Sequence, residues 1–379
     1  MNAEYLSWIE NGVEQRALWR SENGSPPPQK LRVVDDTLSA DAAYRLACAG
    51  TALLWRGDFN NARQLLQAMM RRAGTQKSRR SGKAPSPTPR EAFEAHRQRV
   101  AQRARMLGML LLPFSAGHIV PLRRAPDVAQ ACCDAYGPST EAYVASLREL
   151  LGLIGAHEWR KKGAPIPALG ASIHPHYGVF SPVRGEYVDL VAEAPLPPGD
   201  IALAFDIGVG SGVLSAVLAQ RGVRRIIATD IDPRALACAA DNLQRLGWQA
   251  QVELLQIDLF PPQRAALIVC NPPWLPAHPS STVEQAIYDP DSRMLRGFLS
   301  GLAAHLTPEG EAWLILSDLA EHLGLRSRAE LPAWIDAAGL QLKGRIDKRP
   351  RHPKVADPTD PLHAARAAEV TSLWRLGLQ

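Results

Sequence analysis

Residues 204–214 read Ala-Phe-Asp-Ile-Gly-Val-Gly-Ser-Gly-Val-Leu, and the second half of the chain is organised around this stretch. Residues 201–207 are a short, largely apolar run without polar alternation, which is typical of a parallel strand buried on both faces. Gly208, Gly210 and Gly212 follow, and glycine permits positive φ angles and close approach of a ligand to the backbone. Residues 213–220 then have helical spacing. A strand, a glycine turn and a helix N-terminus predict a nucleotide site, with a tight turn without ligand as the alternative.

The residues around the glycines indicate which nucleotide. Their spacing departs from the G-x-G-x-x-G of dinucleotide-binding folds, and the preceding Asp206 would repel a pyrophosphate but attract an ammonium. A second expected strand, 224–229, ends at Asp230, whose carboxylate suits both hydroxyls of an unphosphorylated ribose. Asp258 ends a third strand, 251–257. An amino acid joined to a nucleoside is S-adenosylmethionine, so the sequence predicts a site for this cofactor.

A second motif, Asn271-Pro272-Pro273-Trp274, follows the apolar run 266–270, an expected fourth strand. The prolines hold the chain extended and fix the direction of the neighbouring carbonyls. The Asn271 side-chain oxygen and the Pro272 carbonyl offer two acceptors for a planar NH2 group, and Trp274 offers a flat face for stacking. The motif predicts methyl transfer to a nitrogen that is aligned rather than deprotonated by a strong base. The alternative is an Asn-Pro turn with an exposed tryptophan.

These motifs, together with 229–236 (Thr-Asp-Ile-Asp-Pro-Arg-Ala-Leu), resemble class I S-adenosylmethionine-dependent methyltransferases of the methyltransferase small domain type. The nearest resemblance is to HemK-like enzymes, which methylate a glutamine amide of release factors, and to related RNA and DNA amino-methyltransferases. It covers roughly residue 175 to the C-terminus. In the family the fourth residue of the second motif is usually Tyr or Phe, so Trp274 is a departure that bears on what fits beside it.

The resemblance assigns roles to individual residues. It implies that the methionine part, ribose and adenine of the cofactor are held by a set that comprises Asp206, Gly208, Gly210, Gly212, Asp230, Ile231, Asp258, Leu259 and Asn271. It implies that the acceptor is held by Asn271, Pro272, Pro273 and Trp274. By a looser match, Phe180, Arg184 and Glu186 are candidates for the substrate pocket.

Composition limits the class of protein. At 379 residues, with 46% apolar and 21% charged residues, the chain is expected to be an ordinary globular protein of two domains. Five cysteines without CxxC spacing argue against a disulfide scaffold or zinc site and favour a reducing compartment. No apolar run approaches membrane-spanning length, and the N-terminus lacks a signal-peptide pattern, so we expect a cytoplasmic protein. The net charge of +5 is compatible with an RNA partner.

The first part of the chain, 1–165, has helical spacing over 41–70, 91–112 and 140–153, with Ser139 as an expected N-cap. We therefore expect a mainly α-helical N-terminal domain for substrate recognition, with a basic linker at 75–90. The segment 71–105 contains eleven Lys or Arg and is a candidate for RNA contact, or else a solvated face. His174 and His176 resemble half of a metal site without a third ligand, which favours loop packing and no metal.

The predicted architecture is α/β. Residues 171–379 are expected to form a Rossmann-like, seven-stranded class I methyltransferase sheet, with 340–347 and 370–376 as the antiparallel edge that the resemblance implies. The predicted function is S-adenosylmethionine-dependent N-methylation of a planar nitrogen, a protein glutamine as in release factors. The alternative is an amino group of an rRNA, tRNA or DNA base. More distant alternatives are a nicotinamide-dependent oxidoreductase and a non-catalytic RNA-binding protein. The sequence does not indicate an oligomeric state.

Overall fold

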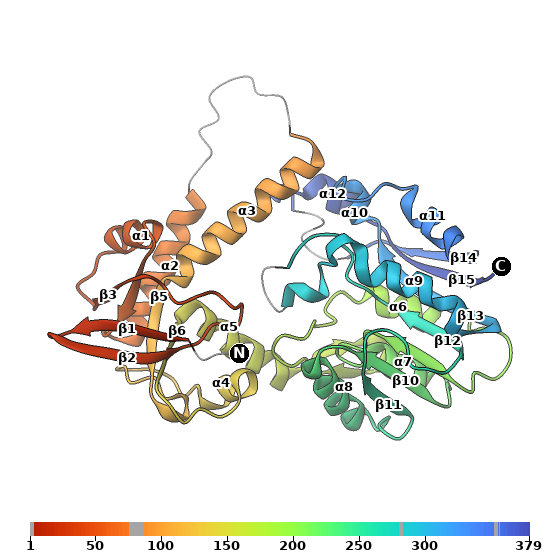
Figure 1. The fold of residues 1–379 in the computed structure, drawn as a ribbon, viewed down its shortest axis with the longest axis horizontal. Helices are drawn as coiled ribbons and strands as arrows, with labels where there is room; N and C mark the ends of the chain where they lie inside the picture. Colours follow the sequence, from red (N-terminus) through yellow and green to blue (C-terminus); the bar gives the residue numbers. More distant parts are fainter. Residues whose placement is uncertain (1–3, 76–86, 280–282, 352–354, 356) are drawn as a thin grey trace. The chain divides into compact units, whose positions relative to one another are not determined.

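The computed structural model describes residues 4–75, 87–279, 283–351, 355 and 357–379. The chain divides into two compact units, one of residues 1–86 and 95–158 and the other of 87–94 and 159–379 (Figure 1). This division lies close to the expected boundary at 165–171, and each unit contains its own large sheet. Among the described helices, none is both long enough and apolar enough to cross a membrane.

The first unit is built on a six-stranded mixed sheet with the order β1-β2-β6-β5-β4-β3. Its strands are β1 (Tyr5–Glu10), β2 (Val13–Trp19), β3 (Lys30–Val34), β4 (Thr51–Trp55), β5 (Leu110–Phe114) and β6 (Tyr143–Ser146). Its helices are α1 (Ala40–Cys48), α2 (Phe59–Thr75), α4 (Ala129–Tyr136) and most of α3 (Pro89–Gly108) and α5 (Leu147–Lys162).

The expectation of a mainly helical first domain missed this sheet. β4 lies inside the expected helical stretch 41–70, β5 begins inside the expected helix 91–112, and β6 occupies the start of the expected helix 140–153. All of β5 and β6 is buried, and a short apolar run buried on both faces has no alternation that separates it from a helix. Ser139 is not an N-cap: its hydroxyl donates to the carbonyl of Glu141, and α5 begins at Leu147.

The second unit carries the seven-stranded sheet that the sequence predicted, with the order β11-β10-β9-β12-β13-β15-β14. Its strands are β9 (Ala204–Ile207), β10 (Ile226–Asp230), β11 (Val252–Gln256), β12 (Ala265–Cys270), β13 (Leu306–Ser317), β14 (Leu340–Lys348) and β15 (Thr371–Leu378). The pairings among β9–β13 are parallel, whereas β15 pairs antiparallel with both β13 and β14. The antiparallel edge is therefore confirmed. A two-stranded sheet of β7 (Ala164–Ile166) and β8 (Ala171–Ile173) precedes it.

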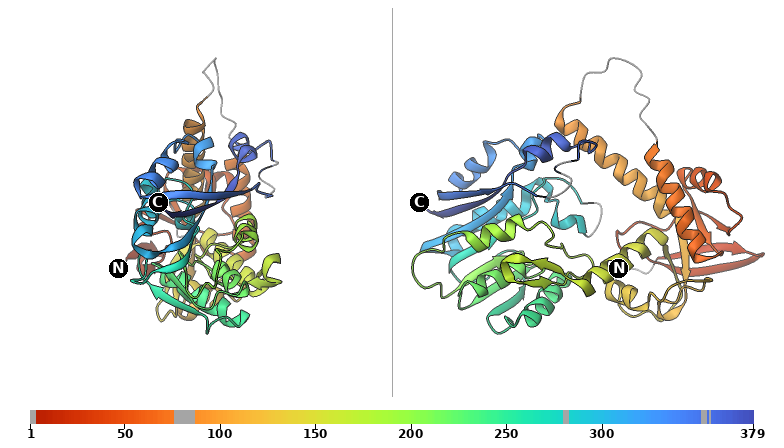
Figure 2. Two further views of the ribbon diagram at one scale, coloured as in Figure 1. Left: turned by 90° about the vertical axis from the view of Figure 1, so that its right-hand side faces the viewer. Right: turned by 180° about the vertical axis from the view of Figure 1, so that it is seen from behind.

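Helices cover both faces of the seven-stranded sheet (Figures 1 and 2). One face packs against α6 (Glu186–Glu193), α7 (Val213–Gln220) and α8 (Pro233–Leu246). The other packs against α9 (Arg293–His305) and α11 (Glu330–Ala337). The shorter helices are α10 (Leu319–His322) and α12 (His363–Ala368). Along β12, Leu267 and Val269 face the first layer while Ile268 and Cys270 face the second, which explains why the strand sequence is continuously apolar.

Candidate active site

The strand register brings the two sequence motifs to the same edge of the sheet. In parallel pairing, Ile207 at the end of β9 lies beside Thr229 of β10 on one side and Cys270 of β12 on the other. The next residues, Gly208, Asp230 and Asn271, therefore leave neighbouring strands at their carboxyl ends. This edge is where ligands bind in open α/β sheets.

The glycine turn after β9 is shaped by its backbone. Gly208, Gly210 and Gly212 have φ angles of 78°, 51° and 81°, all in the left-handed region. The backbone N–H groups of Gly208 and Val209 both donate to the carbonyl of Thr229, at 2.9 Å each. A Cβ on Gly212 would lie 3.1 Å from Cα of Ala239 in α8, so glycine is also needed for close packing. The turn ends at Gly212, which is the N-cap of α7.

A buried carboxylate, Asp206, and a partly exposed one, Asp230, flank this turn. Asp230 accepts the N–H of Gly210 on one oxygen and that of Asp232 on the other, both at 3.0 Å, which leaves lone pairs on each oxygen for a ribose. Asp206 is fully buried and accepts the Ser215 hydroxyl at 2.6 Å. Burial raises the pKa of Asp206 to about 6, an effect that the hydrogen bonds from Ser215 partly oppose. An ammonium beside this carboxylate would stabilise its ionised form.

The candidates for adenine contact lie at the ends of β10 and β11. Ile231 is 63% exposed, a large apolar side chain with little packing of its own. Asp258 is half exposed and forms an ion pair with Arg293 at 3.1 Å. Leu259 has a φ of 65°, which is unusual for a residue other than glycine, and its carbonyl accepts the Thr229 hydroxyl. The strained turn at Leu259 is thus attached to the strand that ends in Asp230.

The Asn271–Trp274 turn follows β12 as expected, but its two functional side chains contact each other. The indole Nε1–H of Trp274 donates to Oδ1 of Asn271 at 2.9 Å. One ring face of Trp274 is covered by Arg184, whose guanidinium carbon lies 5.1 Å from the ring centroid. Sequence reasoning treated the asparagine oxygen and the indole face as free for the acceptor. In the structure one lone pair of that oxygen and one face of that ring have partners.

A buried ionic network supports this turn. Arg184 donates from Nε to Glu186 at 2.7 Å and from Nη2 to Glu369 at 3.0 Å, and Glu369 also accepts the Ser317 hydroxyl at 2.7 Å. Both glutamates and Ser317 are buried. Phe180, the third pocket candidate, packs against the core on the α6–α8 side of the sheet. The sequence singled out Arg184 and Glu186 but missed Glu369 and Ser317, because neither belongs to a local motif.

Two further residues escaped the sequence analysis. Met294 at the start of α9 lies over the glycine turn, because a Cβ on Gly208 would come within 2.9 Å of its Cε. Asp289 accepts the N–H groups of Met294 and Leu295 at 3.0 and 3.1 Å and thereby fixes the start of this helix. The first turn of α9 therefore lies beside the glycine turn.

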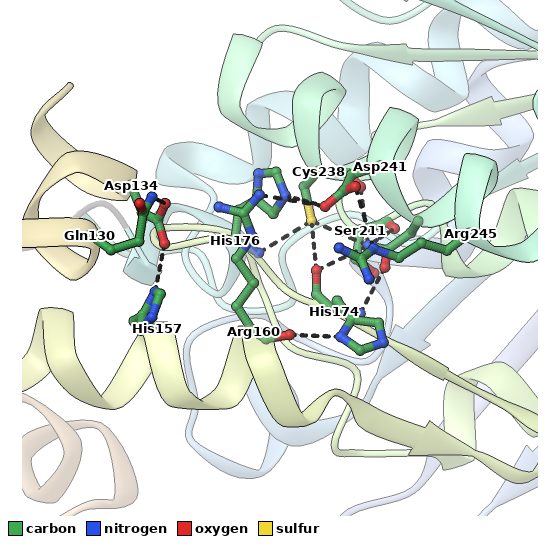
Figure 3. Close-up of polar contacts among 11 residues, drawn as sticks. Gln130, Asp134, His157, Arg160, His174, His176, Ser211, Cys238, Asp241 and Arg245 are labelled. Carbon is green, nitrogen blue, oxygen red and sulfur yellow. Dashed lines mark hydrogen bonds and ion pairs between the residues drawn. The ribbon is translucent and has the colours of Figure 1, made fainter. Parts of the chain in front are cut away.

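The segment that contains His174 and His176 lies beside α8, near Ser211 of the glycine turn (Figure 3). His174 contacts the Arg160 carbonyl through Nδ1 at 2.6 Å, and His176 contacts Asp241 through Nε2 at 3.1 Å. The buried Asn242 donates to the carbonyls of His174 and Ser211, which ties this segment to the turn. Among the residues that the structure describes, no group of three His, Cys, Asp or Glu could hold a metal ion. Both imidazoles thus have hydrogen-bond partners within the second unit.

Comparison with known proteins agrees with this geometry. A family model described as "Methyltransferase small domain" matches residues 172–327. The chain is 33% identical over 177 residues to a tRNA1(Val) (adenine(37)-N6)-methyltransferase of Shewanella loihica, covering 44% of this chain and 69% of the relative. The chain belongs to the methyltransferase small domain family. Members of this family use S-adenosylmethionine.

Other relatives differ in what their names say they modify. A release factor glutamine methyltransferase of Cereibacter sphaeroides is 31% identical over 171 residues, which cover 41% of this chain and 58% of the relative, less than two thirds of its length. A solved structure of ribosomal protein L11 methylase from Lactobacillus delbrueckii subsp. bulgaricus aligns with a TM-score of 0.38 and 16% identity, over 55% of this chain and 85% of that one. The similarity to the two curated relatives is confined to less than half of this chain.

The residues present fit S-adenosylmethionine. The three left-handed glycines add no side chains of their own to the turn, and Asp230 retains acceptor capacity at the end of β10. The buried carboxylate of Asp206 has no cationic partner among its described contacts, so an amino group at that point would relieve the cost of its ionisation. We assign the edge formed by β10, β9 and β12 as the candidate active site.

Proposed function

We propose that this protein is an S-adenosylmethionine-dependent N-methyltransferase that acts on a planar amide or amine nitrogen, in the first instance a glutamine side chain of a protein. One observation carries the proposal: Gly208, Asp230 and Asn271 leave adjacent parallel strands at one edge of the sheet. The residues suited to a nucleoside and those suited to a planar NH2 group therefore adjoin.

The chemistry asked of the protein is mainly alignment. S-adenosylmethionine supplies an electrophilic methyl group when bound. The remaining lone pair of Asn271 Oδ1 and the Pro272 carbonyl accept hydrogen bonds from the two N–H groups of the substrate nitrogen. These two hydrogen bonds orient the nitrogen so that its own lone pair points at the methyl carbon. As positive charge develops on that nitrogen, the two oxygens stabilise it, and no basic side chain is needed until the proton is lost to water.

The experiment combines transfer with binding. Asn271→Ala should lower transfer of a tritiated methyl group to acceptors in an extract of a deletion strain by about 100-fold. S-adenosylhomocysteine should bind within twofold of the wild-type affinity by calorimetry. Asn23→Ala, an exposed substitution in the first unit, is the matched control and should change neither quantity. An Asn271→Ala protein that transfers methyl groups at the wild-type rate would refute the assigned acceptor residues.

A second acceptor class, the exocyclic amine of a nucleobase, is favoured by the tRNA adenine methyltransferases among the relatives, whose alignments cover up to 73% of their length. An adenine amine is also a planar NH2 group. Treating the extract with RNase before the reaction decides between the two: loss of label indicates a nucleic acid acceptor, whereas loss on protease treatment alone indicates a protein.

For the first unit we propose substrate recognition, with the basic segment 71–105 contributing if the acceptor is RNA. Lys77, Arg79, Arg80 and Lys83 of this segment lie outside the described residues. Within α3, Arg99 and Arg105 are exposed. If they neutralise phosphates, replacing both with Glu should weaken binding to total tRNA and reduce the salt slope of log K by about 2. An unchanged slope would remove this segment from the RNA contact.

Comparison of ligands separates the distant alternatives. S-adenosylhomocysteine should raise the unfolding temperature, because a ligand bound only by the folded state stabilises it by mass action. NADH should leave it unchanged. The reverse result would favour an oxidoreductase, and binding of RNA without methyl transfer to any fraction would favour a non-catalytic protein.

A further inference from the structure

The hydrogen bond between Trp274 and Asn271 gives the tryptophan a role beyond stacking. An indole N–H can only donate, so its partner on Asn271 must be the amide oxygen, and the orientation of the whole amide is thereby determined. Phenylalanine has no donor, and tyrosine carries its hydroxyl at the far tip of the ring. Neither residue usual in the family can therefore make this contact with the Asn271 side chain from position 274 in the same ring placement.

Trp274 is itself held in place. Arg184 lies over one ring face at 5.1 Å, which is a cation–π contact. Two buried carboxylates hold the Arg184 guanidinium, Glu186 at 2.7 Å and Glu369 at 3.0 Å. Glu369 is 2% exposed and receives the Ser317 hydroxyl from the end of β13. The chain of contacts thus runs from the sheet through Glu369, Arg184 and Trp274 to the oxygen of Asn271.

We propose that Trp274 is a positioning residue that sets the amide orientation of Asn271, and that Glu369 acts through Arg184 to hold Trp274 in place. The inference rests on the proposed function. With one lone pair of Asn271 Oδ1 bonded to the indole, the other is the one directed to a substrate N–H. An uncharged planar NH2 group, of an amide or a base amine, then donates to that lone pair.

The contact can be tested without knowledge of the acceptor, by NMR of protein with 15N-labelled tryptophan indoles. The Trp274 resonance is identified by its loss in Trp274→Phe. In Asn271→Ala this resonance should move, because its hydrogen-bond acceptor is gone. In Glu369→Gln it should also move, while the resonance of the exposed Trp159 stays fixed in both variants. A Trp274 resonance unchanged in Asn271→Ala would overturn the inference.

The functional consequence is tested by kinetics with the extract acceptors. Trp274→Phe and Trp274→Tyr should both lower kcat about tenfold, leave the KM for S-adenosylmethionine unchanged and bind S-adenosylhomocysteine as the wild type does. Trp159→Phe is the matched control. Full activity of the Tyr variant would show that stacking alone suffices and would overturn the inference. If wild-type protein transfers no methyl group to any fraction, the proposed function fails, whereas the indole resonances still decide the positioning contact.

Discussion

The glycine turn after β9 and the Asn271–Trp274 turn after β12 leave adjacent strands, yet different interactions fix them. The glycine turn is held by backbone geometry, with left-handed glycines, N–H groups that donate to Thr229 and Asp230, and contact with Ala239. The Asn271–Trp274 turn is held by side chains, and its support reaches Glu369, which lies 185 residues from Arg184 in sequence. A cofactor common to a family needs a constant shape, whereas side-chain support allows the acceptor to differ between members.

We call the glycine turn with Asp206 and Asp230 the cofactor half of the site. The largest expected effect concerns the backbone of this half. Gly212→Ala combines a left-handed φ with a Cβ 3.1 Å from Cα of Ala239, so we expect S-adenosylhomocysteine to bind about 100-fold more weakly. Gly222→Ala is the matched control, because Gly222 has a φ of 92° but no described atom within 4 Å of the added Cβ. Calorimetric titration measures both variants. Equal losses in the two would show that packing against α8 does not shape the turn.

A smaller loss is expected when one side chain of the cofactor half is changed. Asp230→Asn keeps the size of the residue but removes one charged acceptor, and hydrogen bonds to charged groups contribute about 1.5–3 kcal/mol. S-adenosylhomocysteine should therefore bind about 30-fold more weakly in calorimetry. Asp200→Asn, at an exposed ion pair with Arg224, should bind normally. Wild-type affinity in Asp230→Asn would remove the ribose role from Asp230.

Acid should weaken the cofactor half selectively. The pKa of Asp206 is raised to about 6 by burial, so the carboxylate is ionised above pH 7 and becomes protonated as the pH falls through 6. Its attraction for a ligand ammonium is complete at high pH and lost at low pH, so the affinity for S-adenosylhomocysteine should drop about tenfold between pH 7 and 5. Asp206→Asn should bind weakly at pH 7 and show no such drop. A flat wild-type profile would contradict the assignment.

The smallest effect is expected in the acceptor half of the site, which is the Asn271–Trp274 turn with the side chains that support it. Ser317→Ala removes one of the two partners of a buried carboxylate oxygen of Glu369, at a cost of about 1–2 kcal/mol in the free energy of unfolding. Methyl transfer should fall about threefold while the affinity for S-adenosylhomocysteine is unchanged. Ser300→Ala, whose hydroxyl donates to Gly297 on an exposed helix face, is the control. A loss of cofactor affinity in Ser317→Ala would mean that the two halves are not separately supported.

The contrast between the halves also explains what could be predicted from the sequence. Gly208, Gly212, Asp230 and Asn271 each follow a buried strand, and the carboxyl ends of parallel strands meet at one edge, so local pattern sufficed to bring them together. Glu369 and Ser317 approach Arg184 only through the pairing of β15 with β13, which no local pattern encodes. Asn242 left a weak signal, a polar residue on the buried face of α8.

The first unit was harder for a related reason. Its strands β4 and β5 are four- to five-residue apolar runs directly adjacent to helices, so the helical spacing of their neighbours masked them. In the second unit, glycines, prolines and aspartates separate the strands from the helices. Such residues mark where each strand ends, so the strands of the second sheet could be predicted from the sequence, whereas the apolar runs of the first sheet could not be separated from the neighbouring helices.

The position of β15 has a consequence for how the protein is made. This strand follows β14 in sequence but lies between β14 and β13, so β14 cannot join the sheet until residues 371–378 have left the ribosome. A nascent chain that has emerged only to α11 already exposes β9, β10 and β12, whereas Glu369 has not yet emerged. The contacts of Glu369 that hold Arg184, and through it Trp274, are therefore among the last to form as the chain is made.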